Sequence, residues 1–211
     1  NPDKCVSCGM CMVNCPFGAI ADKSQIYQLI KAMNEGSEVI AILAPAFVGQ
    51  FGPKATPNKI KAALLDIGFA DVWEVAVGEA KHYVHSVVTG KLPFLLTSCC
   101  PSWSMLGKKY FPEVIDEISN ALTPMVATAR AARITSPNAK IVFVGPCVAK
   151  KLEASRRTVR SEVDFVITFE ELAGMFDAKE IDFNTYDKEE ELNDAFGAGR
   201  GYAVASGVAG A

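Results

Sequence analysis

Short apolar runs alternate along the chain with stretches whose apolar residues recur at helical spacing. The runs that read as strands are residues 39–43, 72–77, 92–96, 140–144 and 163–168. The stretches that read as helices are residues 22–34, 57–67, 79–88, 103–119, 124–135 and 169–176. Strands that alternate with helices are typical of α/β proteins with mostly parallel sheets flanked by helices.

Two polar residues mark expected helix starts. Asp22 stands before the first helical pattern, and Thr56 stands before Pro57 in the second. Short polar side chains at such positions accept hydrogen bonds from the first free amides of a helix. We therefore expect Asp22 and Thr56 to be N-caps.

Composition and charge narrow the class of protein. The chain has 211 residues, 50% of them hydrophobic, and a formal net charge of −3. These values exclude wholesale disorder, and no basic patch indicates nucleic-acid binding. The apolar runs are too short to cross a bilayer, and we see no signal peptide at the start. Seven cysteines, an odd number, point to a reducing cytoplasmic setting rather than a disulfide scaffold.

Four cysteines lie within eleven residues near the start. Cys5, Cys8, Cys11 and Cys15, followed by Pro16, fit the pattern C-x2-C-x2-C-x3-C-P. This is the signature of bacterial [4Fe–4S] ferredoxins, in which thiolates are the preferred ligands of iron. Zinc is the alternative, but zinc sites usually pair two C-x2-C knuckles across a longer spacer.

The fourth cysteine of such a run has its own role in two-cluster ferredoxins, where it binds the other cluster. Cys5, Cys8 and Cys11 would then share one cluster, and Cys15 would complete another. Its remaining partners would precede residue 1, so we expect residues 1–21 to be part of a ferredoxin-type domain and residues 22–211 to form the second domain.

The other three cysteines follow predicted strands. Cys99 and Cys100 lie in Thr-Ser-Cys-Cys-Pro-Ser-Trp, and Cys147 lies in Pro-Cys-Val-Ala-Lys-Lys-Leu-Glu. In parallel sheets, functional sites gather where strands end. Taken singly, each of these cysteines would more often be a buried apolar residue.

Together the motifs resemble the catalytic domain of [FeFe]-hydrogenases. That family carries TSCCPxW and PCxxKxxE motifs downstream of a ferredoxin-type run, in the order found here. The resemblance implies a partial iron-only hydrogenase fold and an H-cluster, which is a [4Fe–4S] cube joined to a two-iron site with CO, cyanide and azadithiolate. Its reaction is the reversible interconversion of protons plus electrons with H2.

The resemblance also implies residue roles. Cys100 and Cys147 would bind the cube, Cys99 would be the proton-passing thiol, and Lys150 would donate to a cyanide ligand. The residues implied to line the pocket are Ala44, Pro45, Ala46 and Pro146. The plainer interpretation of Lys150 is a solvated lysine paired with Glu153.

A proton relay is implied as well. Glu79 and Ser119 match relay positions, and His82 stands where the family usually has a second glutamate. The alternative is a surface helix with incidental polar residues. A weaker idea is that Glu79, His82 and His85 bind a metal ion.

Two departures qualify the resemblance. Gly145 stands where well-known members have methionine, which suggests a divergent subgroup. No third cysteine motif is present, and two ligands cannot hold a cube, so we expect the 211-residue chain to be a fragment that is inactive alone.

Other functions remain open at this stage. One is a non-catalytic electron-transfer module, and another is a hydrogenase relative that serves in iron–sulfur assembly or sensing. The partners implied are an electron carrier such as ferredoxin, hydrogenase maturation proteins and the missing C-terminal part, with no nucleic acid and no membrane.

Overall fold

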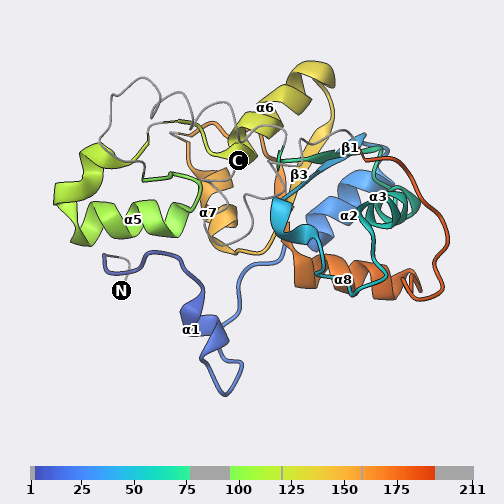
Figure 1. The fold of residues 1–211 in the computed structure, drawn as a ribbon, viewed down its shortest axis with the longest axis horizontal. Coiled ribbons are helices and arrows are strands. Elements are labelled where there is room, and N and C mark those ends of the chain that lie inside the picture. Colours follow the sequence, from blue (N-terminus) through green and yellow to red (C-terminus); the bar gives the residue numbers. More distant parts are fainter. Residues whose placement is uncertain (1–2, 77–95, 120, 158, 193–211) are drawn as a thin grey trace.

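The computed structural model describes residues 3–76, 96–119, 121–157 and 159–192. A four-stranded parallel sheet with the order β2-β1-β3-β4 forms the centre (Figure 1). The strands are β1 (Val39–Leu43), β2 (Asp71–Glu74), β3 (Lys140–Gly145) and β4 (Phe165–Thr168). The predicted α/β class with a parallel sheet flanked by helices is confirmed.

The two central strands are almost wholly buried. All five residues of β1 are buried, as are all residues of β3 after Lys140. Ile42 of β1 is aligned with Trp73 on one side and Phe143 on the other. Strands covered on both faces read as continuous apolar runs, which is why the pattern identified β1 and β3 closely.

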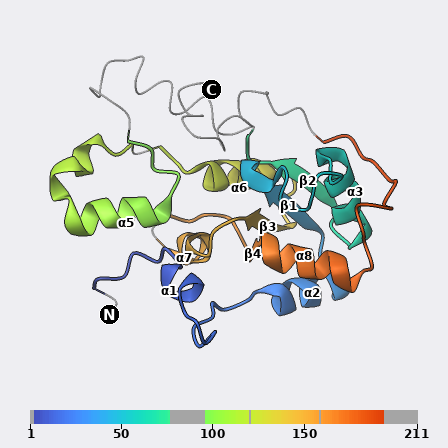
Figure 2. The ribbon, with the colours of Figure 1, turned by 60° about the horizontal axis from the view of Figure 1, so that its bottom comes forward.

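Helices cover both faces of this sheet. Helix α6 (Pro124–Thr135) packs on β1 and β3 from one side, whereas α2 (Ile26–Asn34) and α8 (Phe169–Ala178) lie on the other (Figures 1 and 2). The remaining elements are α1 (Met10–Val13), η1 (Pro45–Phe47), α3 (Pro57–Asp66), α5 (Pro101–Tyr110), η2 (Pro112–Glu117) and α7 (Ala149–Ser155).

One of the two predicted caps is confirmed. Thr56 accepts a hydrogen bond from the amide of Lys59 at 3.3 Å. Asp22 is not a cap, because α2 begins at Ile26 with Gln25 in the N-cap position. The Asp22 carboxylate instead pairs with the ammonium of Lys151, a long-range partner that the local pattern does not contain.

The predicted helix over residues 103–119 is wrong in extent. Helix α5 ends at Tyr110, and the 3-10 helix η2 starts at Pro112. Proline has no amide hydrogen and its ring collides with the preceding turn, so an α-helix does not continue through it. The predicted strands over 72–77 and 163–168 are also too long, since β2 ends at Glu74 and β4 begins at Phe165.

Two predicted elements fall wholly or mostly outside the described residues. The helix over 79–88 lies outside the described residues, and so does all of the strand over 92–96 except Leu96. Leu96 forms an isolated parallel bridge with Ile118. In the described part of the chain, no helix is long and apolar enough to cross a membrane.

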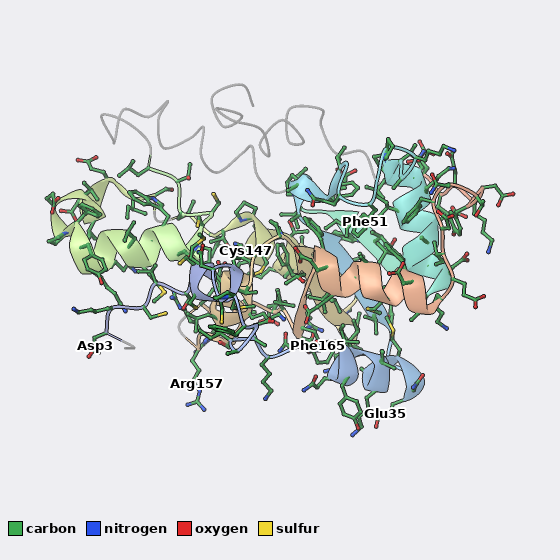
Figure 3. All side chains as sticks on the ribbon, turned by 90° about the horizontal axis from the view of Figure 1, so that it is seen from below. Asp3, Glu35, Phe51, Cys147, Arg157 and Phe165 are labelled. Carbon is green, nitrogen blue, oxygen red and sulfur yellow. The ribbon has the colours of Figure 1, made fainter. Side chains whose placement is uncertain are left out.

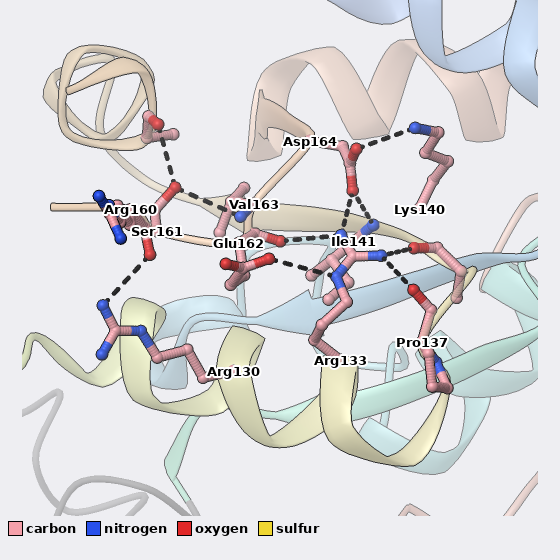
Figure 4. Close-up of polar contacts among 12 residues, drawn as sticks. Arg130, Arg133, Pro137, Lys140, Ile141, Arg160, Ser161, Glu162, Val163 and Asp164 are labelled. Atoms are coloured by element: carbon pink, nitrogen blue, oxygen red, sulfur yellow. Dashed lines mark hydrogen bonds and ion pairs between the residues drawn. The ribbon is translucent and has the colours of Figure 1, made fainter. Parts of the chain in front are cut away.

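Arginines of α6 fasten the segment that leads into β4 (Figure 4). Arg130 donates to the carbonyls of Val159 and Arg160 at 2.9 and 3.2 Å. Arg133 pairs with Asp164 at 2.7 Å, and Asp164 also accepts from the amide of Ile141 at 2.9 Å. These bonds fix β4, β3 and α6 relative to one another.

Candidate active site at the carboxyl ends of the strands

The strand order creates a switch point between β1 and β3. The chain leaves β1 for β2 on one side and later returns for β3 on the other. In open parallel sheets, ligands bind in the crevice at the carboxyl ends of the strands beside such a point. A pocket of about 190 Å3 lies there. Its lining residues are Ala44, Pro45, Ala46, Val75, Cys99, Pro124, Met125, Phe143, Pro146, Cys147 and Lys150.

The backbone at the strand ends shapes this pocket. The amide of Ala44 donates to the carbonyl of Val144 at 2.9 Å, which joins the end of β1 to the end of β3. Pro45 then opens η1 and turns the chain away. The four residues expected to line the pocket, Ala44, Pro45, Ala46 and Pro146, all do so.

The three later cysteines are placed differently. Cys99 and Cys147 are half-buried and line the pocket, whereas Cys100 is exposed and does not. Cys100 is the N-cap of α5, and its Sγ accepts from the amide of Trp103 at 3.4 Å. The hydroxyl of Thr97 lies 3.6 Å from Cys99 Sγ. Adjacent cysteines therefore present their thiols to different surroundings.

Lys150 connects the two cysteine motifs. Its ammonium donates to the backbone carbonyl of Cys99 at 2.8 Å and pairs with Glu153 at 2.7 Å. Glu153 is buried and also accepts from the Thr123 hydroxyl at 2.6 Å. With only 12% of its side chain exposed, Lys150 is not a solvated surface lysine, although Glu153 is its partner one turn along.

Of the expected relay residues, the structure describes only Ser119. Ser119 is buried, and its hydroxyl accepts from the amide of Ala121 at 3.2 Å. It does not line the pocket. Glu79, His82 and His85 lie outside the described residues, so both the relay and the metal idea stay predictions.

The first cysteine group lies on the loop around α1. Cys5, Cys8 and Cys11 are exposed, Cys15 is half-buried, and all four are free thiols. The amide of Ser7 donates to Cys5 Sγ and the amide of Ala19 to Cys15 Sγ, each at 3.3 Å.

These amides favour the charged form of the sulfur. The backbone N–H of Ser7 lowers the pKa of Cys5, and the backbone N–H groups of Phe17 and Ala19 lower the pKa of Cys15. A lowered thiol pKa favours the thiolate, which is the form that binds metal.

The cysteine segment around α1 lies beside Cys147 and contacts α5 (Figure 3). Lys109 of α5 donates to the carbonyl of Cys5 at 2.8 Å. Gly9 has φ +80°, and a methyl group added there would come within 3.0 Å of Val148, the residue after Cys147. A glycine thus brings the segment's backbone close to α7.

The donor chemistry fits iron–sulfur clusters, but the ligands are not gathered in advance. Soft thiolates with amides directed at them are what such clusters require. Yet within the described ranges no three His, Cys, Asp or Glu side chains converge as a metal site. The first group has the right residues at the right spacing, and the second contributes two thiols and a cation to one pocket.

Comparison with known proteins decides the family. Residues 37–211 match the family model "Iron only hydrogenase large subunit, C-terminal domain", and residues 1–21 match "4Fe-4S binding domain". The chain belongs to the iron-only hydrogenase large-subunit family. The predicted family and its iron–sulfur cofactor class are confirmed at this level.

Two hydrogenases illustrate the likeness. The chain is 30% identical to the NADP-reducing hydrogenase subunit HndD of Solidesulfovibrio fructosivorans over 98% of its own length and 41% of that protein's. A structure described as showing stepwise [FeFe]-hydrogenase H-cluster assembly in HydA matches with a TM-score of 0.64 and 25% identity, over 83% of this chain and 51% of the other. The chain therefore spans about half or less of the length of these hydrogenases.

A second kind of relative shares part of the family's sequence. The chain is 36% identical over 92 residues to the cytosolic Fe-S cluster assembly factor NAR1 of Kluyveromyces lactis, covering 44% of this chain and 20% of that protein. The proteins to which this chain is similar thus include both hydrogenases and an assembly factor.

Sequence reasoning missed several residues of the pocket. Phe143, Val75, Pro124 and Met125 line it, yet all look like ordinary core residues in the sequence. Thr123, which supports Glu153, was likewise not identified. A polar residue before Pro124 at a helix start was the one available signal.

Proposed function

We propose that the full-length polypeptide is an [FeFe]-hydrogenase that interconverts protons plus electrons with H2. The observation that carries the proposal is the meeting of Cys99, Cys147 and Lys150 in one otherwise apolar pocket at the ends of β1 and β3. Two thiols and a cation at this point of an α/β sheet suit a redox metal centre.

The proposed roles follow from position. Cys100 and Cys147 would hold the [4Fe–4S] cube, and the two-iron site would supply the redox chemistry of hydrogen. Lys150 would donate a charge-assisted hydrogen bond to cyanide, held in place by Glu153 and the Cys99 carbonyl. Ala44, Pro45, Ala46 and Pro146 would exclude water from one side.

Proton movement is proposed for two groups of the chain. The Cys99 thiol, half-buried in the pocket, would hold and release a proton at Sγ. Glu79 and Ser119 would continue the relay outward. Ser119 lies beside Leu96, since its amide donates to the Leu96 carbonyl at 2.8 Å, on the same stretch of chain as Cys99.

The domain at residues 1–21 would carry electrons. Cys5, Cys8 and Cys11, with Cys15 completing the run or another cluster, would hold a [4Fe–4S] cluster beside Cys147, where Gly9 meets Val148. We propose an acceptor or donor such as ferredoxin as the external partner, maturation proteins for cofactor insertion, and a cytoplasmic location. A cube takes four ligands and this chain offers two, so we expect no turnover from residues 1–211 alone.

Hydrogen evolution by the full-length protein, loaded with a synthetic two-iron cofactor and driven by a reduced dye, tests the proposal. We expect turnover that falls by at least about 100-fold in Cys99→Ala, the loss typical of a removed acid–base group. Ser155→Ala, on the exposed end of α7, is the matched control and should keep full activity.

The alternative is an assembly factor, which the NAR1 likeness supports. Intact [4Fe–4S] signals with no turnover, before and after cofactor loading, would favour it and refute the hydrogenase proposal. Lys150 favours the hydrogenase proposal, because its ammonium lines the pocket and can donate to a small ligand there in addition to the Cys99 carbonyl and Glu153.

A further inference from the structure

At the end of β3, the Phe143 ring fills the space that a side chain at residue 145 would need. Phe143 and Gly145 are two residues apart in a strand and so face the same side. A methyl group at Gly145 would lie 2.3 Å from Cε1 of the Phe143 ring and 2.7 Å from Cζ. Such distances are far inside van der Waals contact, so the ring stays where it is only because residue 145 has no side chain.

The ring also forms part of the pocket wall. Phe143 is 3% exposed and lines the cavity together with Cys99, Cys147 and Lys150. The Lys150 ammonium lies 5.8 Å from the centre of the ring, within the range of a cation–π contact. The ammonium thus has two polar partners, the Cys99 carbonyl and Glu153, and an aromatic face.

We propose that Phe143, seated over Gly145, is the specificity-determining residue of this pocket. Its ring limits the size of the ligand that can reach the Cys99 thiol and the Lys150 ammonium. The ligand class is a small group that bears a hydrogen-bond acceptor or negative charge, because Lys150 is the donor of an otherwise apolar, thiol-lined wall. The inference concerns the site of the proposed function, but its test needs no hydrogen chemistry.

Thiol alkylation of the full-length protein, stripped of iron so that no cysteine is held by a cluster, measures the limit. Iodoacetamide is the small probe and fluorescein-5-maleimide the bulky one, and fragmentation mass spectrometry separates Cys99 from Cys100. In Phe143→Ala we expect the bulky reagent to label Cys99 about tenfold faster, while iodoacetamide changes by less than about threefold. The exposed Cys5 is the internal control and should not change. Equal acceleration of both reagents, or none, would overturn the proposal.

A double-mutant cycle tests the shared space directly. Gly145→Ala should lower Tm by about 5 °C in the natural background, because the added methyl meets the ring. In the Phe143→Ala background the same change should have almost no effect. Additive Tm shifts would show that the ring does not occupy the space and would overturn the proposal.

The two tests remain readable if the hydrogenase proposal fails. Loss of turnover or of cofactor binding would not alter alkylation rates or Tm values in the unloaded protein. Conversely, turnover with an unchanged size limit in Phe143→Ala would leave the proposed function in place and reject the role of Phe143.

Discussion

The two cysteine groups are held by the chain in different ways. Around α1, three of four thiols are exposed, and the hydrogen bonds to Cys5 and Cys15 come from amides two and four residues away. At the strand ends, Cys99 and Cys147 come from segments 48 residues apart and line one pocket. Lys150 of α7 donates to the Cys99 carbonyl and pairs with the buried Glu153. We expect a site of the first kind to depend on its metal for stability, whereas the fold itself brings Cys99 and Cys147 to one pocket.

Iron removal should produce the largest difference between the two regions, in the protection of their amides from hydrogen exchange. Metal binding to such local thiolate sites contributes on the order of 10 kcal/mol to their folding. Chelation should therefore raise amide exchange at residues 5–19 by at least about 100-fold, while exchange in β1 and β3 changes by less than about threefold. Hydrogen exchange with mass spectrometry makes the comparison, and equal loss of protection in both regions would contradict it.

At the strand-end site, removal of the Glu153 carboxylate should lower the free energy of unfolding more than any other single substitution considered. Glu153→Ala leaves the buried Lys150 ammonium without its carboxylate, which costs about 3 kcal/mol. Glu35→Ala removes an exposed carboxylate from a similar pair, with Lys31 at 3.7 Å, and should cost less than about 0.5 kcal/mol. Urea unfolding measures both, and similar costs for the two variants would argue against a pre-arranged lysine.

Alanine substitutions at two glycines, Gly9 and Gly18, test the contact between the α1 loop and Val148. Gly9 and Gly18 both have positive φ, but only Gly9 faces a neighbour, Val148 at 3.0 Å from an added methyl group. Both alanine variants carry backbone strain of about 1 kcal/mol. Gly9→Ala should cost about 1 kcal/mol more and expose the segment to trypsin at Lys23. Identical unfolding and proteolysis in the two variants would show that the segment does not depend on this approach.

The smallest expected effect is on the pH dependence of stability, and it comes from Asp66, which lies away from both cysteine groups. Lys188 and then Tyr186 lower the pKa of Asp66 through hydrogen bonds to its carboxylate. A depressed folded-state pKa stabilises the protein above the unfolded pKa, and this stability is lost as pH falls through the folded value. Because the pair is largely exposed, the contribution is less than about 1 kcal/mol. Unfolding at pH 7 and pH 3 should show a smaller difference in Asp66→Asn, and an unchanged difference would refute the assignment.

The contrast between the regions also explains what could be predicted from the sequence. The central strands and Thr56 are encoded by local pattern, and the first cysteine run by spacing alone. The misassigned Asp22 pairs with Lys151, 129 residues away, which no local pattern reveals. Phe143 looks like any core residue in a buried strand, and its place in the pocket depends on Gly145 and on strand order.

Infrared spectroscopy of the full-length protein after loading with the two-iron cofactor tests the central claim most directly. The account predicts CO and cyanide bands, with the cyanide bands shifted or lost in Lys150→Ala and retained in Lys151→Ala. Intact [4Fe–4S] EPR signals with no CO or cyanide bands would contradict it, because the pocket of Cys99, Cys147 and Lys150 would then hold no two-iron site.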